Sequence, residues 1–344
     1  MKQGYPVAER GGISQQRYEQ KTGMQRRGIQ TMLKTAGVRM DGPMRIVDLG
    51  CRNGDTTLGL LEAAPKEAHV IGVEEFSQAL TLARFKFGLH NDADERDLLK
   101  LVGDILQFTG SNFYEFRDTA KPMLGRVDFV HSMMDELLSV VSGADLVAGF
   151  QLLHWLDNDS NDLPKGEILK SIAHIMVPGG TFISGTSTAF VGIDPNGMID
   201  GMTKAEYSID EHPFFKEVYA RIEAAVKMMP GHAPMPVSAG AQLKLDALVG
   251  LMESCGFTDV QTGAFLVTPG REEVISEVVK IRPKHQGRLE GIPEVKAAEI
   301  IARAIAETNE HFDSADSRDP RQRVMNIWDA VPYVKATRSD KDVK

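Results

Sequence analysis

The 344-residue chain has only two cysteines, Cys51 and Cys255, and no apolar run approaches the roughly 18 residues that span a membrane. Two cysteines form one disulfide at most, and the nine histidines show neither an H-E-x-x-H nor an H-x3–5-H pattern. We therefore expect a reduced protein without a metal site. The first residues, MKQGYPVAERGG, lack the apolar core of a secretory signal, so we expect a cytoplasmic protein with no membrane partner.

Runs of basic residues are also missing. The net charge is −9, and no stretch of lysine and arginine is longer than two residues. A protein that follows a nucleic-acid backbone needs a cationic surface, so no nucleic-acid partner is expected. An acidic chain that binds an anion has to gather its hydrogen-bond donors locally.

Short apolar runs alternate with helical patterns between residues 45 and 187. Four of the runs are RIVDL (45–49), HVIGVE (69–74), VDFVHS (127–132) and ADLVAGF (144–150), and a fifth follows a Pro-Gly-Gly turn within 166–187. This alternation predicts an α/β fold with a doubly wound parallel sheet. Further along, TDVQTGAFLVT and VPYVKATR (331–338) read as strands.

A glycine-containing turn, VDLGCRNGD, joins the first of these strands to a helix. Gly50 and Gly54 permit a tight turn and close approach of a ligand, and a helix N-terminus offers free N–H groups. Glu74 ends the next strand, 24 residues after Gly50, where a carboxylate can accept both hydroxyls of a ribose. The spacing G-x-x-x-G departs from G-x-G-x-x-G and disfavours NAD.

At these residues the chain resembles the class I S-adenosylmethionine-dependent methyltransferases. IVDLGCRNG is similar to their first motif, VIGVE to the second, VDFVHSMMDEL and GADLVAGFQLLHWL to the third and fourth, and LKSIAHIMVPGGTFI to their Pro-Gly-Gly strand. The resemblance implies a Rossmann-like, seven-stranded, mostly parallel sheet with a mainly helical cap, and S-adenosylmethionine as the cofactor. The cofactor-binding residues it implies are Tyr18, Asp48, Gly50, Gly54, Glu74, Ser132, Met133, Met134 and Phe150.

Two departures from the family pattern stand out. Arg52 replaces the central glycine of the first motif, which costs on the order of 1 kcal/mol if that position needs a positive φ. The Gly-Asp of LVGDIL (101–106) lies 41 residues before Asp145, too far for one strand-helix-strand step, whereas Val127 lies 18 before it. We therefore place the adenine edge at residues 132–134, where methionine has to replace the usual acidic partner.

The pair His154 and Trp155 follows the fourth strand, at the edge where open parallel sheets bind ligands. Both side chains can donate to a desolvated carboxylate. From the residues alone, a core tryptophan beside a histidine bonded to a backbone carbonyl is an equal alternative. The H-W pair resembles the carboxyl methyltransferases of the trans-aconitate, juvenile hormone acid and SABATH types.

A second match to the SABATH type lies in RYEQKTGMQRR, which places Tyr18 and Gln25 seven residues apart. Lys21 and Thr22 replace an Asn-Ser of that pattern, and an ordinary solvated helix is the alternative. The resemblance implies that Tyr18 covers the cofactor, while Gln25, His154 and Trp155 position the substrate carboxylate.

These features predict an O-methyltransferase that converts a small-molecule carboxylic acid to its methyl ester by in-line transfer. A carboxylate is already ionised at pH 7, so no general base is needed. Two alternatives remain open: methylation of a phenol, nitrogen or carbon with His154 as base, and a non-catalytic cofactor-binding regulatory protein. A homodimer is compatible with the sequence.

The expected organisation is a lid helix (1–40), a methyltransferase core (41–188) with an insertion (89–126), and a cap (189–241). A second core segment (242–268), a second cap segment (269–324) and the last strand with the tail (325–344) follow. Within the cap, five side chains either line an acyl pocket or form plain core: Met228, Met229, Met235, Phe214 and Phe215.

Overall fold

The computed structural model describes residues 22–89, 116–150, 152, 165–185, 213–229, 245–267, 289, 292–314 and 329–340. The chain divides into two compact units. Unit 1 comprises Met1–Ser187, Leu243–Gly263 and Pro332–Lys344, and unit 2 comprises Thr188–Gln242 and Ala264–Val331. Within the described residues, no helix is both long and apolar enough to cross a membrane.

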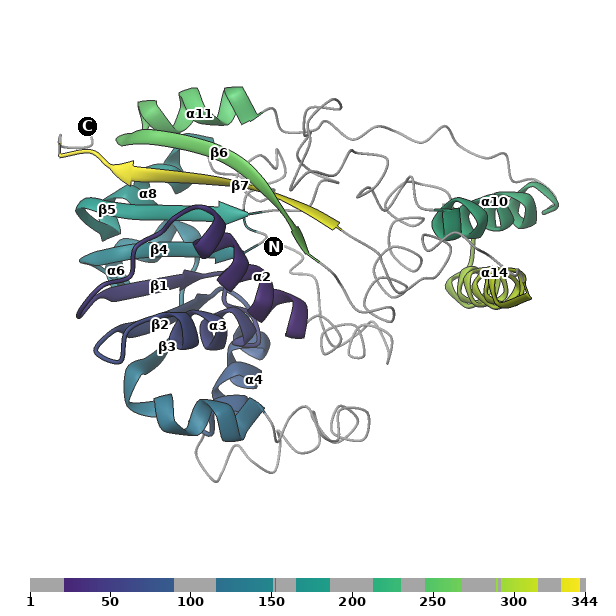
Figure 1. Cartoon of the computed structure of the whole chain (residues 1–344), viewed down its shortest axis with the longest axis horizontal. Coiled ribbons are helices and arrows are strands. Elements are labelled where there is room, and N and C mark those ends of the chain that lie inside the picture. The colour runs from purple at the N-terminus through teal and green to yellow at the C-terminus, as the bar shows by residue number, and fades with distance from the viewer. Residues whose placement is uncertain are drawn as a thin grey trace. The chain divides into compact units, whose positions relative to one another are not determined.

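Seven strands form one sheet in the order β3-β2-β1-β4-β5-β7-β6 (Figure 1). Their bounds are β1 Arg45–Leu49, β2 His69–Glu74, β3 Val127–His131, β4 Ala144–Phe150, β5 Met176–Gly185, β6 Phe257–Val267 and β7 Asp329–Arg338. Strands β1 to β5 pair in parallel, and β7 is antiparallel to β5. The predicted seven-stranded, mostly parallel, Rossmann-like sheet is therefore confirmed.

The sheet is buried because its central strands are almost continuously apolar. Strands of parallel sheets carry such runs because helices cover both of their faces. The fully buried side chains include those of Ile46, Val47, Leu146, Val147 and Phe182. Because a buried parallel strand is a nearly continuous apolar run, the bounds of β1, β2 and β4 coincide with the predicted runs.

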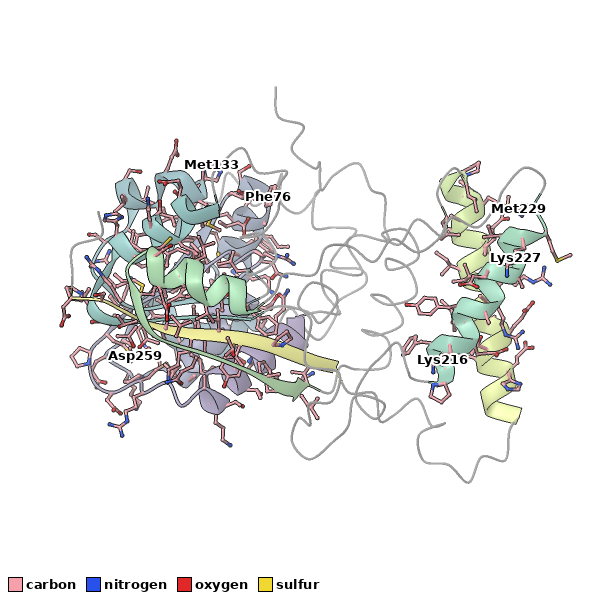
Figure 2. All side chains as sticks on the ribbon, turned by 90° about the horizontal axis from the view of Figure 1, so that it is seen from above. Phe76, Met133, Lys216, Lys227, Met229 and Asp259 are labelled. Atoms are coloured by element: carbon pink, nitrogen blue, oxygen red, sulfur yellow. The ribbon has the colours of Figure 1, made fainter. Side chains whose placement is uncertain are left out.

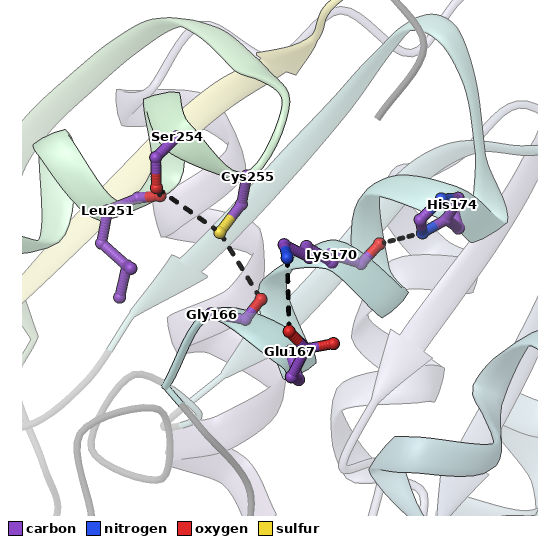
Figure 3. A network of polar contacts seen from close by, with 7 residues as sticks. All are labelled: Gly166, Glu167, Lys170, His174, Leu251, Ser254 and Cys255. Atoms are coloured by element: carbon purple, nitrogen blue, oxygen red, sulfur yellow. Dashed lines mark hydrogen bonds and ion pairs between the residues drawn. The ribbon is translucent and has the colours of Figure 1, made fainter. Parts of the chain in front are cut away.

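The helices described in unit 1 are α2 Thr22–Thr35, α3 Asp55–Ala63, α4 Ser77–Phe87, α6 Leu137–Val140, α8 Lys165–Ile175 and α11 Leu245–Ser254, with 3-10 turns η1 Lys121–Arg126 and η2 Met134–Glu136. Helices α2 and α3 pack against each other, as do α8 and α11. Figure 3 shows the second pair, where Cys255 after α11 donates its thiol to the carbonyl of Gly166 on α8 at 3.5 Å. The thiol is thereby used in packing.

The predicted Pro-Gly-Gly turn lies inside β5 and does not precede it. Strand β5 begins at Met176, which pairs with Ala144, and the next pair is Leu146 with Thr181. The extra residues bulge from the pairing, and Gly179 takes φ 76. A bulge lets a strand continue past a turn-like sequence by leaving those residues unpaired.

The end of the predicted insertion packs onto the helices beside the sheet. Phe116 is 6% exposed and Ala120 is fully buried. The Phe116 ring meets Phe87 of α4 edge-on, with 5.2 Å between centroids. The guanidinium of Arg126 donates to the carbonyls of Pro65 and Ala68, which fixes the connection from α3 to β2.

Two helices are described in unit 2, α10 Pro213–Lys227 and α14 Glu294–Ser314, and they pack against each other. Phe214 and Phe215 are both fully buried in the core of this pair. Met228 is 86% exposed, so the acyl-pocket interpretation is wrong for this residue, and Met235 lies outside the described residues. The two phenylalanines follow the plain-core alternative, because the apolar face of α10 is needed to hold α14.

Candidate cofactor site

The loop between β1 and α3 has a strongly constrained backbone. Gly50, Arg52 and Gly54 take φ 73, 50 and 85. The N–H groups of Gly50 and Cys51 both donate to the carbonyl of Val73, at 2.9 and 3.1 Å, which ties the loop to β2. A Cβ on Gly54 would lie 2.9 Å from the ring of Phe87, so space as well as conformation requires glycine there.

Glu74 stands at the end of β2 and is 3% exposed. Its Oε2 accepts the backbone N–H of Arg52 at 2.8 Å, and its Oε1 accepts that of Phe76 at 3.0 Å. An ionised carboxylate has about four acceptor positions, so both oxygens can still accept from a diol. The amide of Arg52 thus holds Glu74 in place, even though the residue departs from the family pattern.

Asp48, on β1, is fully buried. Its Oδ2 accepts the hydroxyls of Thr56 and Thr57 at 2.7 and 2.6 Å, while Oδ1 has no partner among the described residues. Burial raises the pKa of Asp48 to about 7; the two hydroxyls oppose the rise, and the carboxylates of Glu74 and Asp55 add to it. The group titrates in the physiological range.

A buried ion pair supports the first turn of α3. Lys86 Nζ lies 2.7 Å from Asp55 Oδ1, and the exposed fractions of the two side chains are 8% and 1%. The same ammonium lies 4.0 Å from the centroid of the Phe116 ring. Burial raises the pKa of Asp55, and the charge of Lys86 opposes the rise. Helix α4 is thereby fixed to the start of α3.

Three buried oxygen atoms in this loop region, Asp48 Oδ1, Asn53 Oδ1 and Asp55 Oδ2, have no hydrogen-bond partner among the described residues. Buried acceptors are costly unless a donor reaches them. These acceptors therefore suit a ligand that brings N–H donors and positive charge. A phosphate at this helix N-terminus would instead sit beside the buried carboxylates of Asp48 and Asp55. The residues fit the ammonium and sulfonium groups of S-adenosylmethionine better than a dinucleotide diphosphate.

An apolar edge lies beside Glu74. In the parallel pairing of β2 and β3, Glu74 is opposite His131. Phe76 and Met133, each two residues further on, therefore leave the sheet at the same edge, and Figure 2 shows them near each other. Phe76 is half-buried, and Met133 is 38% exposed. Met133 lies where a purine edge was predicted. Phe76 was not among the predicted site residues, although its position two residues after the acidic strand end is a usable signal.

Of the other residues predicted at this edge, Ser132 is 4% exposed. Its N–H donates to the Glu74 carbonyl at 3.2 Å, and its hydroxyl to the Met133 carbonyl at 2.9 Å. Met134 is half-buried and begins η2. Ser132 therefore joins the ends of β2 and β3 through its backbone N–H, while its hydroxyl donates to the neighbouring residue.

Phe150, at the end of β4, packs against α2. A Cβ on Gly28 would lie 2.5 Å from the Phe150 ring, which is 6% exposed. Leu152 lies against the loop, because its Cδ1 is 3.9 Å from the position that a Cβ on Gly50 would take. Sequence patterns gave no signal for the role of Leu152.

Gln25 lies on α2 and is 6% exposed. It precedes Gly28 by three residues, so both lie on one face of the helix, toward the end of β4. Arg26 binds the carboxylate of Glu62 on α3 through Nε at 2.6 Å, and Gln30 donates to the same group at 2.8 Å. The described part of the predicted lid helix, α2, is thus held against α3 within unit 1.

The remaining predicted substrate and cofactor contacts, Tyr18, His154 and Trp155, lie outside the described residues. A separate open hollow of about 470 Å³ lies at the opposite edge, where the strands begin, and contains the His69–Asp128 pair at 2.9 Å. No group of three or more metal-binding side chains occurs in the described ranges.

No protein-family model matches the chain. An uncharacterized methyltransferase of Emericella nidulans is 38% identical over 66 residues, which cover 18% of this chain and 23% of that protein. A phosphoethanolamine N-methyltransferase 2 of Haemonchus contortus, solved with phosphomonomethylethanolamine and S-adenosylhomocysteine, is 14% identical with a TM-score of 0.42. That alignment covers 91% of this chain and 53% of the other.

The cyclase SpnF is similar at 14% identity and a TM-score of 0.43, covering 91% of this chain and 81% of its own. The chain therefore spans less than a quarter of the curated relative and about half of the Haemonchus protein. Likeness at these TM-scores assigns no activity. The sheet order and the geometry of the loop between β1 and α3 define the site.

Proposed function

We propose that the chain is an S-adenosylmethionine-dependent methyltransferase. The observation that carries the proposal is the pair of buried acceptors, Asp48 Oδ1 and Asn53 Oδ1, beside a glycine-containing loop whose neighbouring strand ends in Glu74. These groups together offer acceptors for a ribose diol and for a cationic amino-acid moiety. The 66-residue likeness to a methyltransferase supports the same proposal.

Each part of the site has a role in holding this cofactor. Glu74 accepts the ribose hydroxyls, with its carboxylate already oriented by the N–H groups of Arg52 and Phe76. Met133 and Phe76 provide apolar surface for the adenine. Asp48 and Asn53 accept from the α-ammonium group. When bound, the cofactor supplies an electrophilic methyl group on a sulfonium.

We propose a small-molecule carboxylic acid as the acceptor. Support comes from Gln25, whose helix face meets Phe150 at the end of β4, the strand that His154 and Trp155 follow in the sequence. An amide, an imidazole and an indole can all donate to a carboxylate. With the cofactor bound, its sulfonium would supply the methyl group to a carboxylate oxygen, and the products would be a methyl ester and a neutral thioether. The protein aligns the oxygen, the methyl carbon and the sulfur and excludes water.

The test is turnover of S-adenosylmethionine labelled in its methyl group with a panel of mono- and dicarboxylic acids. The expected product releases its label in mild base, as an ester does. In Gln25→Ala we expect KM for the acid to rise at least tenfold, the equivalent of one charge-assisted hydrogen bond, with kcat changed less. Lys34→Ala, at an exposed position of the same helix, is the control and should leave both constants unchanged.

A base-stable product would reject the carboxylate proposal and favour transfer to a phenol, nitrogen or carbon with His154 as general base. In that case activity would fall with an acidic pKa near that of histidine and be lost in His154→Ala. Cofactor binding without turnover of any acceptor would favour the regulatory alternative. Arg52 does not support that alternative, because its amide maintains the contact to Glu74.

A further inference from the structure

The two carboxylate oxygens of Asp48 have opposite surroundings. Oδ2 accepts two hydroxyl groups, those of Thr56 and Thr57, whereas Oδ1 is buried and has no partner among the described residues. If the group is ionised, Oδ1 is a buried acceptor without a donor. If the group is protonated, the proton resides on Oδ1, because Oδ2 is already occupied by two donors. Without a ligand, the geometry therefore favours a protonated Oδ1.

The charges around Asp48 favour the protonated form too. Glu74 and Asp55 are both anionic neighbours, and the buried thiol of Cys51, whose pKa burial raises strongly, is neutral at physiological pH. Lys86 is paired with Asp55. The unliganded loop has no cation paired with Asp48 among the described residues.

None of the other described cations of this region is paired with Asp48. On α2, Arg26 is paired with Glu62 of α3. In the loop itself, Arg52 contributes its backbone N–H to Glu74, and its guanidinium forms no described ion pair with Asp48. A cationic ligand would be the first positive charge to approach Oδ1. It would favour the ionised carboxylate, in the same way that a neighbouring opposite charge does in any ion pair.

We propose that S-adenosylmethionine binds only the ionised form of Asp48, so that cofactor binding expels the proton from Oδ1 and an ammonium donor of the ligand replaces it. This inference rests on the proposed function. The O–H bond of Asp48 breaks, the proton passes to the buffer, and no other group changes its covalent state. The proton-linked residue thus makes cofactor loading dependent on pH within the physiological range.

Because proton release and cofactor binding are linked, the affinity for S-adenosylmethionine should decrease at acidic pH; this part of the pH profile is called the acidic limb. Because Asp48 titrates at about pH 7, the affinity should fall by up to about tenfold for each pH unit below 6.5 and level off at higher pH. The ligand's own α-ammonium, with a pKa of roughly 7.7–8.0, remains protonated over this limb, and its carboxylate remains ionised. The acidic limb therefore arises from titration of the protein and not of the ligand.

The experiment is calorimetric titration of the full chain with S-adenosylmethionine from pH 5.5 to 8, in two buffers of different ionisation enthalpy. At pH 6 the native protein should release about one proton on binding. Asp48→Asn should lose both this release and the acidic limb. Thr57→Val, which removes a donor to the carboxylate, should keep the limb and move its midpoint to higher pH. Asp128→Asn, an exposed site at the far edge, should behave as the native protein does.

Each outcome decides between claims. Absence of cofactor binding by the native protein at every pH would overturn the proposed function. Binding with no proton release, or with a release that persists unchanged in Asp48→Asn, would overturn this inference while leaving the proposed function intact. If Asp48→Asn fails to fold, an unshifted midpoint in Thr57→Val overturns the inference instead.

Discussion

The backbone N–H of Arg52 donates to Oε2 of Glu74 at 2.8 Å, joining the loop after β1 to the end of β2. Arg52 takes φ 50, and the preceding N–H groups of Gly50 and Cys51 donate to the carbonyl of Val73 on the same strand. The conformation of this loop and the position of the Glu74 carboxylate are therefore coupled. A change that releases Glu74 removes one of the contacts between the loop and β2.

Glu74→Gln should weaken cofactor binding and lower stability. The substitution removes the charge that two backbone N–H groups donate to, and hydrogen bonds to charged groups contribute about 1.5–3 kcal/mol. We expect the Kd for S-adenosylmethionine, measured by calorimetry, to rise at least tenfold. Asp128→Asn serves as the control. An unchanged Kd in Glu74→Gln would exclude this carboxylate from the site.

Removing one partner of the buried Lys86–Asp55 pair should be costly. Lys86→Met leaves Asp55 as an uncompensated buried carboxylate, and such changes cost about 3–5 kcal/mol. The double variant Lys86→Met with Asp55→Asn should recover a large part of the loss. Urea unfolding of the native chain and the three variants gives the coupling energy. Purely additive losses would contradict a direct interaction between the two charges.

Gly28→Ala should push α2 away from β4, because the new Cβ would lie 2.5 Å from the ring of Phe150. Overpacking of this kind costs about 1–3 kcal/mol. Gly125→Ala is the matched control, since nothing lies within 4 Å of the Cβ position there. Thermal unfolding should show a lower Tm for the first variant only. Replacing the ring by the smaller side chain in Phe150→Leu should restore part of the Tm that Gly28→Ala loses. If the double variant has no higher Tm than Gly28→Ala, the contact between Gly28 and Phe150 is contradicted.

The stability of the ligand-free protein should carry a pH-dependent contribution from Asp48. Its pKa is about 7 in the folded state against 3.8 as the ordinary value, so the folded state keeps a proton that the unfolded state has lost. The contribution is full below pH 3.8 and is lost as the pH rises through 7. The difference amounts to on the order of 4 kcal/mol. Unfolding free energies of the native protein and Asp48→Asn, compared from pH 4 to 8, should diverge by this amount. Parallel curves would contradict it.

The sequence was sufficient to predict the sheet and the glycine loop, because both are local patterns. The runs 45–49, 69–74 and 144–150 are mostly apolar and match β1, β2 and β4 in their bounds. Gly50 and Gly54 both take the positive φ that a tight turn requires, and so does Arg52, as expected if that position needs it. Backbone requirements of this kind leave a direct mark on residue choice.

Contacts between segments that are distant in the sequence could not be predicted from local sequence patterns. The pairing of Lys86 with Asp55, the placement of Leu152 against the loop and the position of Phe76 depend on how helices and strands pack. The bulge in β5 was missed because Pro-Gly-Gly usually ends an element, whereas here the strand continues past it. Side-chain partners of this kind follow from the tertiary structure rather than from any periodic pattern.

The central claim, that the loop after β1 binds a cationic sulfonium cofactor, is tested most directly by calorimetric titration at pH 8 with S-adenosylmethionine and, separately, with NAD. The account predicts binding of the first with one site per chain and no binding of the second, because the buried groups of the loop are acceptors and carboxylates. Binding of NAD without binding of S-adenosylmethionine would contradict the assignment of the site.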